Sequence, residues 1–286
     1  MDPAEAARQS ARVAALFDRV AGTYDTVDVP WFTPIAERLV AELGPVPGQR
    51  ALDLGTGRGA ALWPLAQAVG PTGHVTGLDL AAQMIAATRN DVSARGLTMV
   101  DLVVADASAP GLPSASFDLA AASLVLFFLP DPLAALTAWV ALLAPGGRLG
   151  VSTFGPREAA WEELDGVFTP FLPPALLDAR TSGTRGPFAS DAGVAALLTS
   201  AALTQVQTAH LNLPVHFRDV AHWQRWSMSH GQRSHWDAVP EKHRDGVIAA
   251  ATERVGAILD PDGGFTLAQQ VRYTLGELPG PSVAIG

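Results

Sequence analysis

The chain has 286 residues, of which 48% are apolar and only 16% are charged, and its formal net charge at pH 7 is −9. This length predicts one domain with a large insertion or two lobes, and the acidic balance argues against nucleic acid as a partner, because phosphate binding needs a basic surface. The absence of cysteine excludes disulfides, thiolate nucleophiles and cysteine-ligated metals.

The chain also lacks the sequence marks of a membrane or exported protein. No stretch approaches the ~18 uninterrupted apolar residues of a spanning helix. The first residues, Met-Asp-Pro-Ala-Glu, do not form the basic region and apolar core of a signal peptide. We therefore expect a cytoplasmic enzyme without a membrane span.

Residues 1–48 are predicted to form two helices. Apolar residues recur at helical spacing over 3–22 and again over 34–43, and a turn rich in glycine and proline at 44–48 leads to the first strand. From 49 to 154, short apolar strands alternate with helices, which predicts an α/β fold with a parallel sheet covered on both faces. The strands expected there are 50–54, 73–79, 99–105, 117–124 and 148–153, and the helices are 81–95, 132–143 and one that carries Leu62, Leu65, Ala66 and Val69.

The first of these strands runs into Ala51-Leu-Asp-Leu-Gly-Thr-Gly-Arg-Gly-Ala60, where three glycines alternate. Glycine lets the backbone approach a ligand closely, and the start of the next helix favours a negative group. Asp79 lies twenty residues past Gly59, at the end of the second strand, where a carboxylate accepts from ribose hydroxyls. The stretch therefore predicts a nucleotide site, although its glycine spacing also fits a dinucleotide.

Asp53 favours one nucleotide over the other. It stands two residues before the first glycine, where an acid suits the ammonium of S-adenosylmethionine (SAM) and would repel a pyrophosphate. The stretch resembles the first motif of class I SAM methyltransferases, and Phe17-Asp-Arg-Val-Ala-Gly-Thr-Tyr24-Asp25 resembles the opening of their UbiE-like, or methyltransferase type 11, group. The resemblance covers residues 12–155 and implies a Rossmann-like, seven-stranded, mostly parallel sheet whose last strand is antiparallel and lies at the edge.

The motifs and this resemblance assign residues to the cofactor. Tyr24 is expected near the methionine end, the glycine loop at the methionine tail, Leu80 and Met84 beside the adenine, and Asp106 at the adenine amino group, with a turn cap as its alternative role. For Arg58, pairing with Asp53 and an approach to the cofactor carboxylate both stay open. The expected cofactor contacts are Tyr24, Asp53, Gly55, Thr56, Gly57, Gly59, Asp79, Leu80, Met84, Asp106, Ala107, Ser123 and Leu124.

The second half is expected to complete the sheet and cover it. A helix at about 190–201 and alternating runs at 205–213 and 265–275 predict a helix and the last two strands, within core segments 189–213 and 263–286. The insertions 155–188 and 214–262 would form a helical lid over the cofactor's methyl group.

Six of the seven histidines lie between His210 and His243, all but His210 within the second lid insertion. Trp223, Trp226 and His230 fall at i, i+3 and i+7, one face of a helix, which suggests an aromatic wall for an apolar substrate, with His230 as general base. Ordinary core packing is the alternative for the two tryptophans, and a position at the end of a helix is the alternative for His230. Phe128, in the apolar loop after the fourth strand, is a further substrate contact, and the histidine spacing offers no metal site.

The sequence thus predicts a SAM-dependent methyltransferase acting on carbon or oxygen of a small hydrophobic molecule, either a specialised metabolite or a quinone. Two alternatives stay open: a methyltransferase fold reused for another reaction such as a cyclisation or as a non-catalytic partner, and an NAD-dependent oxidoreductase. A homodimer also stays open.

Overall fold

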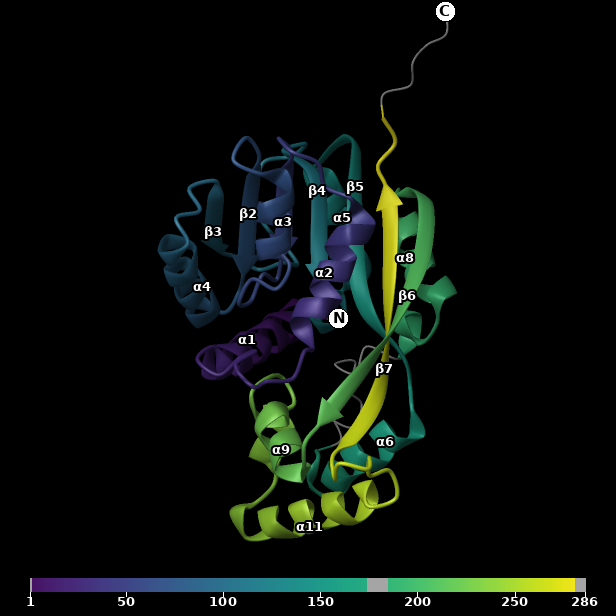
Figure 1. Ribbon diagram of the computed structural model, residues 1–286. Helices are drawn as coiled ribbons and strands as arrows, with labels where there is room; N and C mark the ends of the chain where they lie inside the picture. The colour runs from purple at the N-terminus through teal and green to yellow at the C-terminus, as the bar shows by residue number, and fades with distance from the viewer. Residues whose placement is uncertain (1, 174–184, 281–286) are drawn as a thin grey trace, which may run out of the picture.

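The computed structural model describes residues 2–173 and 185–280, and its centre is one seven-stranded sheet. The strands lie in the order β3-β2-β1-β4-β5-β7-β6 (Figure 1). The neighbours from β3 to β5 are parallel, whereas β7 runs antiparallel to both β5 and β6. The strands are β1 Arg50–Leu54, β2 His74–Asp79, β3 Val100–Val104, β4 Phe117–Ser123, β5 Leu143–Arg157, β6 Thr204–Phe217 and β7 Phe265–Glu277.

The sheet confirms the α/β expectation and corrects one detail of it. The last strand is antiparallel as expected, but it lies between β5 and β6, so that β6 and not β7 forms the edge. Both strands also extend further than their alternating runs: β6 continues to Phe217 and pairs there with Phe265. The insertion between them therefore starts four residues later than residue 214.

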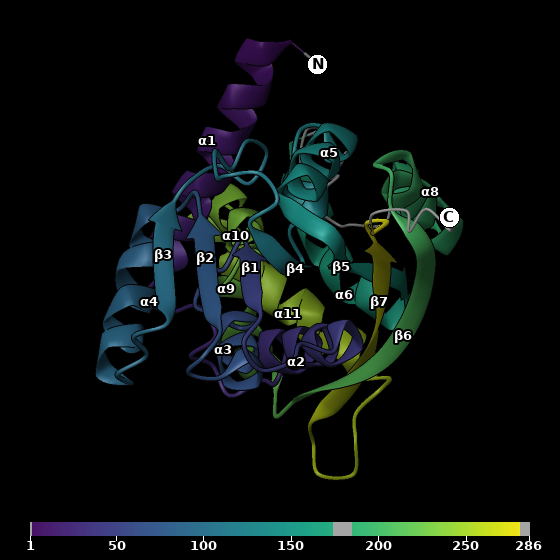
Figure 2. The same ribbon diagram turned by 90° about the horizontal axis from the view of Figure 1, so that it is seen from above.

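Helices cover both faces of the sheet, with α2, α3 and α4 on one side and α5 and α8 on the other (Figures 1 and 2). Several begin at a side-chain cap: Asp2, Asp131, Ser190 and Asp219 each accept a backbone N–H of the first turn. The α-helices are α1 Pro3–Val20, α2 Phe32–Leu43, α3 Leu62–Val69, α4 Ala82–Ala94, α5 Pro132–Leu142, α6 Ala159–Asp165, α8 Asp191–Ser200, α9 Val220–Met228, α10 Arg233–Ala238 and α11 Arg244–Val255, and the short 3₁₀ turns are Leu126–Phe128, Gly166–Phe171, Gly186–Ala189 and Glu241–His243.

Residues 159–173 of the first insertion and 218–262 of the second form a helical lobe at the far end of the β6–β7 hairpin, where α6, α9 and α11 lie together (Figure 1). Residues 174–184 of the first insertion lie outside the described residues. The interior of the lobe is aromatic: the ring of Trp226 lies 5.1 Å from that of Trp31 and 5.2 Å from that of Phe217, measured between centroids. This interior is continuous with the apolar core around the sheet. The lobe is therefore packed onto the rest of the protein.

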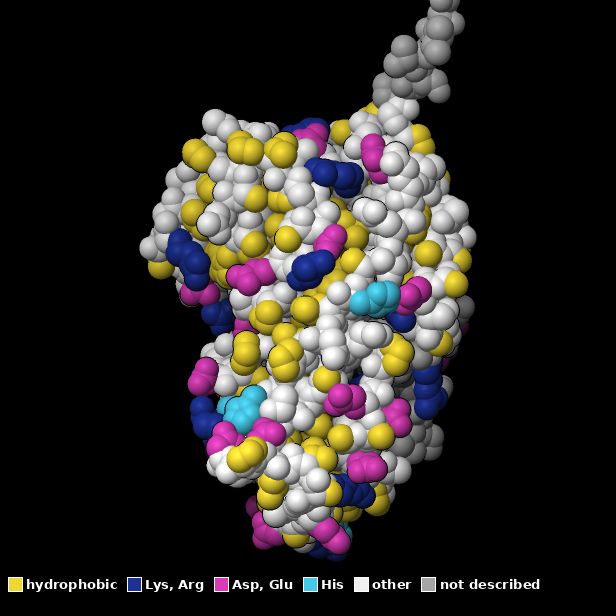
Figure 3. All heavy atoms as spheres, turned by 45° about the vertical axis from the view of Figure 1, so that its right-hand side comes forward, with side chains coloured by type: hydrophobic (Ala, Val, Ile, Leu, Met, Phe, Trp, Pro, Cys, Tyr) yellow, Lys and Arg dark blue, Asp and Glu magenta, His cyan; other side chains and the backbone are white. Residues whose placement is uncertain are grey.

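The helix α1 bridges the sheet and this lobe and has a small core of its own. Val20 and Ala21 pack on Ala81 and Met84, in a cluster separate from the main core. Figure 3 shows one face of the molecule, where acidic, basic and apolar side chains are interspersed and the outline narrows between sheet and lobe. No helix in the described part of the chain combines the length and apolar character needed to cross a membrane.

Candidate functional site

The glycine loop after β1 adopts the left-handed backbone that favours glycine. Gly55, Gly57 and Gly59 have φ angles of +71°, +50° and +88°. A Cβ on Gly55 would lie 2.5 Å from the Val125 side chain, and one on Gly59 would lie 2.6 Å from the Trp63 ring. Backbone conformation therefore favours glycine at all three positions, and packing also excludes a side chain at Gly55 and Gly59.

The backbone N–H groups of this loop are largely used inside the protein. Those of Thr56 and Gly59 donate to the carbonyls of Leu78 and Thr56, at 2.8 and 2.7 Å. The N–H of Gly57 donates to the Asp79 carboxylate at 2.9 Å. These three N–H groups are therefore already hydrogen-bonded within the protein. The polar groups that we consider next belong to side chains.

Two carboxylates stand behind the loop. Asp53 is buried and accepts from the Thr56 hydroxyl at 2.7 Å. Burial and, to a smaller extent, the nearby charge of Asp79 together raise the pKa of Asp53 to about 7, against the opposing effect of that hydrogen bond. Asp79 accepts from the N–H groups of Gly57 and Ala81, and burial raises its pKa as well. Asp79 therefore joins the loop to the start of α4.

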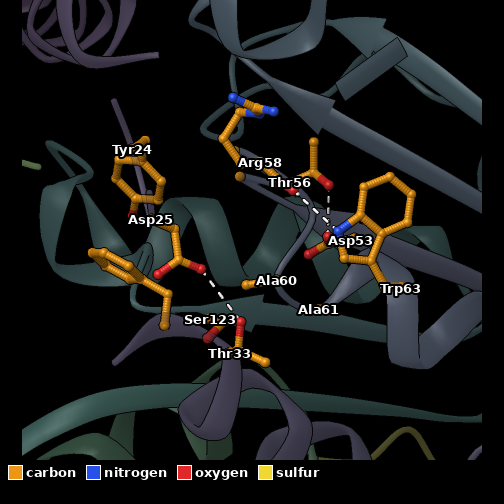
Figure 4. Close-up of a pocket in the computed structure, with 13 residues that line it drawn as sticks. Tyr24, Asp25, Thr33, Asp53, Thr56, Arg58, Ala60, Ala61, Trp63 and Ser123 are labelled. Atoms are coloured by element: carbon orange, nitrogen blue, oxygen red, sulfur yellow. Dashed lines mark hydrogen bonds between the residues drawn. The ribbon is translucent and has the colours of Figure 1, made fainter. Parts of the chain in front are cut away.

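A cavity of about 70 Å³ lies in front of Asp53, between the loop and the segment that follows α1 (Figure 4). Tyr24 and Phe32 close one side with stacked rings whose centroids are 4.4 Å apart. A second void of about 390 Å³ shares Tyr24, Arg58 and Trp63 with it. The lining residues are Tyr24, Asp25, Phe32, Thr33, Asp53, Gly55, Thr56, Gly57, Arg58, Ala60, Ala61, Trp63 and Ser123.

Arg58 holds the loop to two neighbouring helices. Its guanidinium donates to the Ala21 carbonyl at 2.8 Å and to the Asp91 carboxylate of α4 at 2.7 Å. Pairing with Asp53, one of the two expectations, is therefore not what the structure shows. The Nε atom of Arg58 is buried and has no hydrogen-bond partner in the described part of the chain.

The residues expected around the nucleoside do not line this cavity. Met84 is only 1% exposed, because Val20 and Ala21 cover it. Asp106 accepts from the backbone N–H and the hydroxyl of Ser108, at 2.8 and 2.7 Å, as a turn cap does. Leu80 and Ala107 also lie outside the cavity lining, and the Ala107 carbonyl accepts from Trp139 Nε1 at 2.6 Å. The end of α1 thus occupies the side where an adenine is expected.

The end of β4 contributes one of its two expected residues. Ser123 lines the cavity, and its hydroxyl lies 3.1 Å from that of Ser152 on β5. Leu124 does not line it. This residue has a φ of +58°, and its N–H donates to the Ser152 hydroxyl at 3.0 Å.

The aromatic residues expected in the substrate wall are divided between different surroundings. Trp223 packs on Phe168 and Trp236 inside the lobe. Phe128 packs on Phe17 of α1, with ring centroids 5.5 Å apart. Trp226 is buried too, but its ring contacts that of His230, which in turn contacts Phe32 on the cavity wall. Helix α9 ends at Met228, so His230 lies beyond it and the expected single helix face is not formed.

His230 lacks the chemistry of a base in this structure. Its Nδ1 accepts from the Gln232 N–H at 3.3 Å, so the proton of the neutral ring is on Nε2. Burial and, to a smaller extent, the charge of His235 together lower the pKa of His230 to about 3. Neutral imidazole with an Nε2–H can only donate from that atom. Within the described residues, no three His, Cys, Asp or Glu side chains gather as a metal site would require.

Sequence reasoning missed several residues of the cavity. Asp25 adjoins Tyr24, and Trp63 follows the glycine loop, so both stood next to recognised motifs. Phe32 and Thr33 start α2, and only the fold brings that helix to the loop. Their proximity to the glycine motif could not be read from local spacing.

Comparisons with known proteins identify the family of this chain. Residues 52–151 match the family model described as methyltransferase domain. The chain is 34% identical to nocamycin O-methyltransferase of Saccharothrix syringae over 92% of this chain and 97% of that protein. It is 42% identical to aklanonic acid methyltransferase DauC of Streptomyces sp. (strain C5) over 58% of this chain and 76% of that protein.

The solved structures show the same fold. The YcgJ protein of Bacillus subtilis superposes with a TM-score of 0.58 over 86% of this chain and 99% of that one, at 15% identity. The family match and the two relatives establish S-adenosylmethionine as the cofactor and exclude the oxidoreductase alternative. The chain belongs to the S-adenosylmethionine-dependent methyltransferases of the methyltransferase type 11 group.

Proposed function

We propose that this methyltransferase methylates an oxygen atom of a small hydrophobic specialised metabolite, at a group that is already ionised at neutral pH, such as a carboxyl or an acidic enol. Two relatives support the substrate class by name, one as an O-methyltransferase and one as acting on an acid. The first aligns with 92% of this chain, so the similarity is not confined to the cofactor half.

The residues of the cavity suit the methionine end of the cofactor. Carboxylates and hydroxyls of Asp25, Asp53, Thr33 and Thr56 face one small space, which fits a group that carries an ammonium. When bound, the cofactor supplies a methyl group bonded to a sulfonium sulfur, which departs readily as the neutral thioether. The protein then has to align the acceptor and exclude water, and the stacked rings of Tyr24 and Phe32 close the site on one side.

The observation that carries the proposal is the state of His230. The imidazole is neutral, and its Nε2–H is buried and has no hydrogen-bond partner among the described residues. Such a donor can bind an acceptor on the substrate. Trp226 Nε1 is a second such donor beside it, since the two ring centroids are 4.4 Å apart. These donors would hold an anionic oxygen once Phe32, which covers His230, moves aside.

An acceptor that arrives ionised needs no base, which agrees with the low pKa of His230. The test is transfer of a labelled methyl group from SAM to aromatic polyketide acids, phenols and demethylated quinones, followed by location of the label. We expect label on oxygen of an acid or acidic enol. Label on carbon, or no transfer to any acceptor, would contradict the proposal.

Two variants test the role of His230. His230→Gln keeps an N–H donor and is expected to stay within about 5-fold of the normal turnover, whereas His230→Phe removes the donor and is expected to lose about 10-fold or more. A general base would give a large loss in both variants. Equal large losses would therefore overturn the assignment of His230 as a donor.

A further inference from the structure

Asp25 occupies a constrained place at the mouth of the cavity. Its φ of +58° is uncommon outside glycine, although Asp tolerates it better than most residues. The chain around it is fixed, because the Tyr24 N–H donates to the Val20 carbonyl at 2.7 Å and the Thr26 hydroxyl donates to the Thr23 carbonyl at 2.7 Å. Backbone strain of this kind persists where the surroundings hold it, and it gathers at ligand sites.

The carboxylate of Asp25 is poorly satisfied by the protein. Its hydrogen bond is a long one of 3.3 Å from the Thr33 hydroxyl, and it forms no ion pair with any described residue. The guanidinium nearest to it, that of Arg58, is bonded to Asp91 and to a carbonyl. A carboxylate accepts about four hydrogen bonds, so the exposed carboxylate of Asp25 keeps capacity for solvent or for a ligand in the cavity and the adjoining void that it lines.

Asp25 and Asp53 therefore approach the same space from opposite sides (Figure 4). Asp53 comes from β1 and is buried, whereas Asp25 comes from the segment after α1 and remains in contact with solvent. Asp25 and, once it is ionised, Asp53 present carboxylate oxygens to this small cavity, and such oxygens favour a cation. The cofactor's amino-acid end carries such a cation.

We propose that Asp25 binds the ammonium of the cofactor's methionine tail from the side opposite Asp53, and so determines recognition of that tail. The ammonium has three N–H donors, and the Asp25 carboxylate and Thr33 hydroxyl supply acceptors on the side of the cavity away from the glycine loop. The segment after α1 thereby takes part in binding directly, in addition to covering the site.

The experiment compares two ligands that differ in the tail. S-adenosylhomocysteine has the amino-acid end, and 5′-methylthioadenosine has the same nucleoside without it. Calorimetry on Asp25→Asn is expected to show about 10-fold weaker binding of S-adenosylhomocysteine, as for loss of one charged hydrogen bond, and unchanged binding of methylthioadenosine. Asp28→Asn is the matched control, because Asp28 is exposed, lies three residues away and does not line the cavity.

A second variant separates the carboxylate from the backbone. Asp25→Gly removes the side chain where φ is positive and relieves the strain, so it is expected to show the same loss for S-adenosylhomocysteine alone. Unchanged binding of S-adenosylhomocysteine in Asp25→Asn would overturn the proposal, and so would an equal loss for both ligands. Since no acceptor is present, the result does not depend on which metabolite is methylated.

Discussion

The buried carboxylate of Asp53 predicts a specific pH dependence of cofactor binding. Its pKa is raised to about 7 in the ligand-free protein, chiefly by burial, so the group is protonated over most of the range from pH 5 to 7. A bound ammonium favours the ionised form, and binding at low pH must therefore release a proton. The cofactor's own amino group, with a pKa of about 8, stays charged throughout this range.

The magnitude follows from linkage. If Asp53 is ionised in the complex, affinity falls by up to about tenfold for each pH unit below 7, or about 100-fold at pH 5, equivalent to ~2.7 kcal/mol. Calorimetry with S-adenosylhomocysteine at pH 5, 6 and 7 measures this directly. In buffers of different ionisation enthalpy, it also reports about one proton released per ligand at pH 6.

The control is Asp53→Asn, which is expected to bind weakly with little change between pH 5 and 7. It separates Asp53 from Asp25 and Asp79, whose pKa values burial also raises. Equal affinity of the normal protein at pH 5 and 7 would refute the reasoning, as would an undiminished slope in the variant.

In the ligand-free protein, the raised pKa of Asp53 stabilises the fold at low pH, and this contribution is lost as pH rises through 7.

Three further variants or measurements test the structure. Gly55→Ala places a Cβ 2.5 Å from Val125 at a φ of +71° and should cost ~2–4 kcal/mol in urea unfolding, with partial recovery on adding Val125→Ala; a neutral effect would contradict the loop geometry. Arg272→Met leaves the Phe188 carbonyl without its donor and should cost ~2–3 kcal/mol by the same assay. S-adenosylhomocysteine should change amide exchange over residues 15–22, since the end of α1 covers Met84; unaltered exchange would mean that the helix need not move.

Much of the cofactor half could be predicted because its signals are local. The strand over residues 50–54 was predicted within its observed bounds, since a buried apolar run is followed directly by a glycine turn. Asp79 was also correctly placed at the end of β2. The carboxyl ends of parallel strands meet at one edge, so the order of elements sufficed to bring Asp53, Asp79 and Ser123 near one another.

The lid was less predictable because helical spacing does not distinguish a packed face from a binding face. Trp223 and Trp226 share a spacing, yet one lies within the lobe and the other reaches His230 beside the cavity wall. The pKa of His230 depends on burial by residues far away in sequence, such as Phe32. No periodicity near residue 230 carries that information.

The sequence by itself determined the family, the cofactor and the parallel half of the sheet, since these follow from short motifs and from the order of strands and helices. Tertiary structure alone decided the position of β7 between β5 and β6, the cover of α1 over Met84, and the contact of Gly55 with Val125. Each of these depends on packing between segments distant in the chain, where side-chain shape and burial, and not local propensity, select the partner.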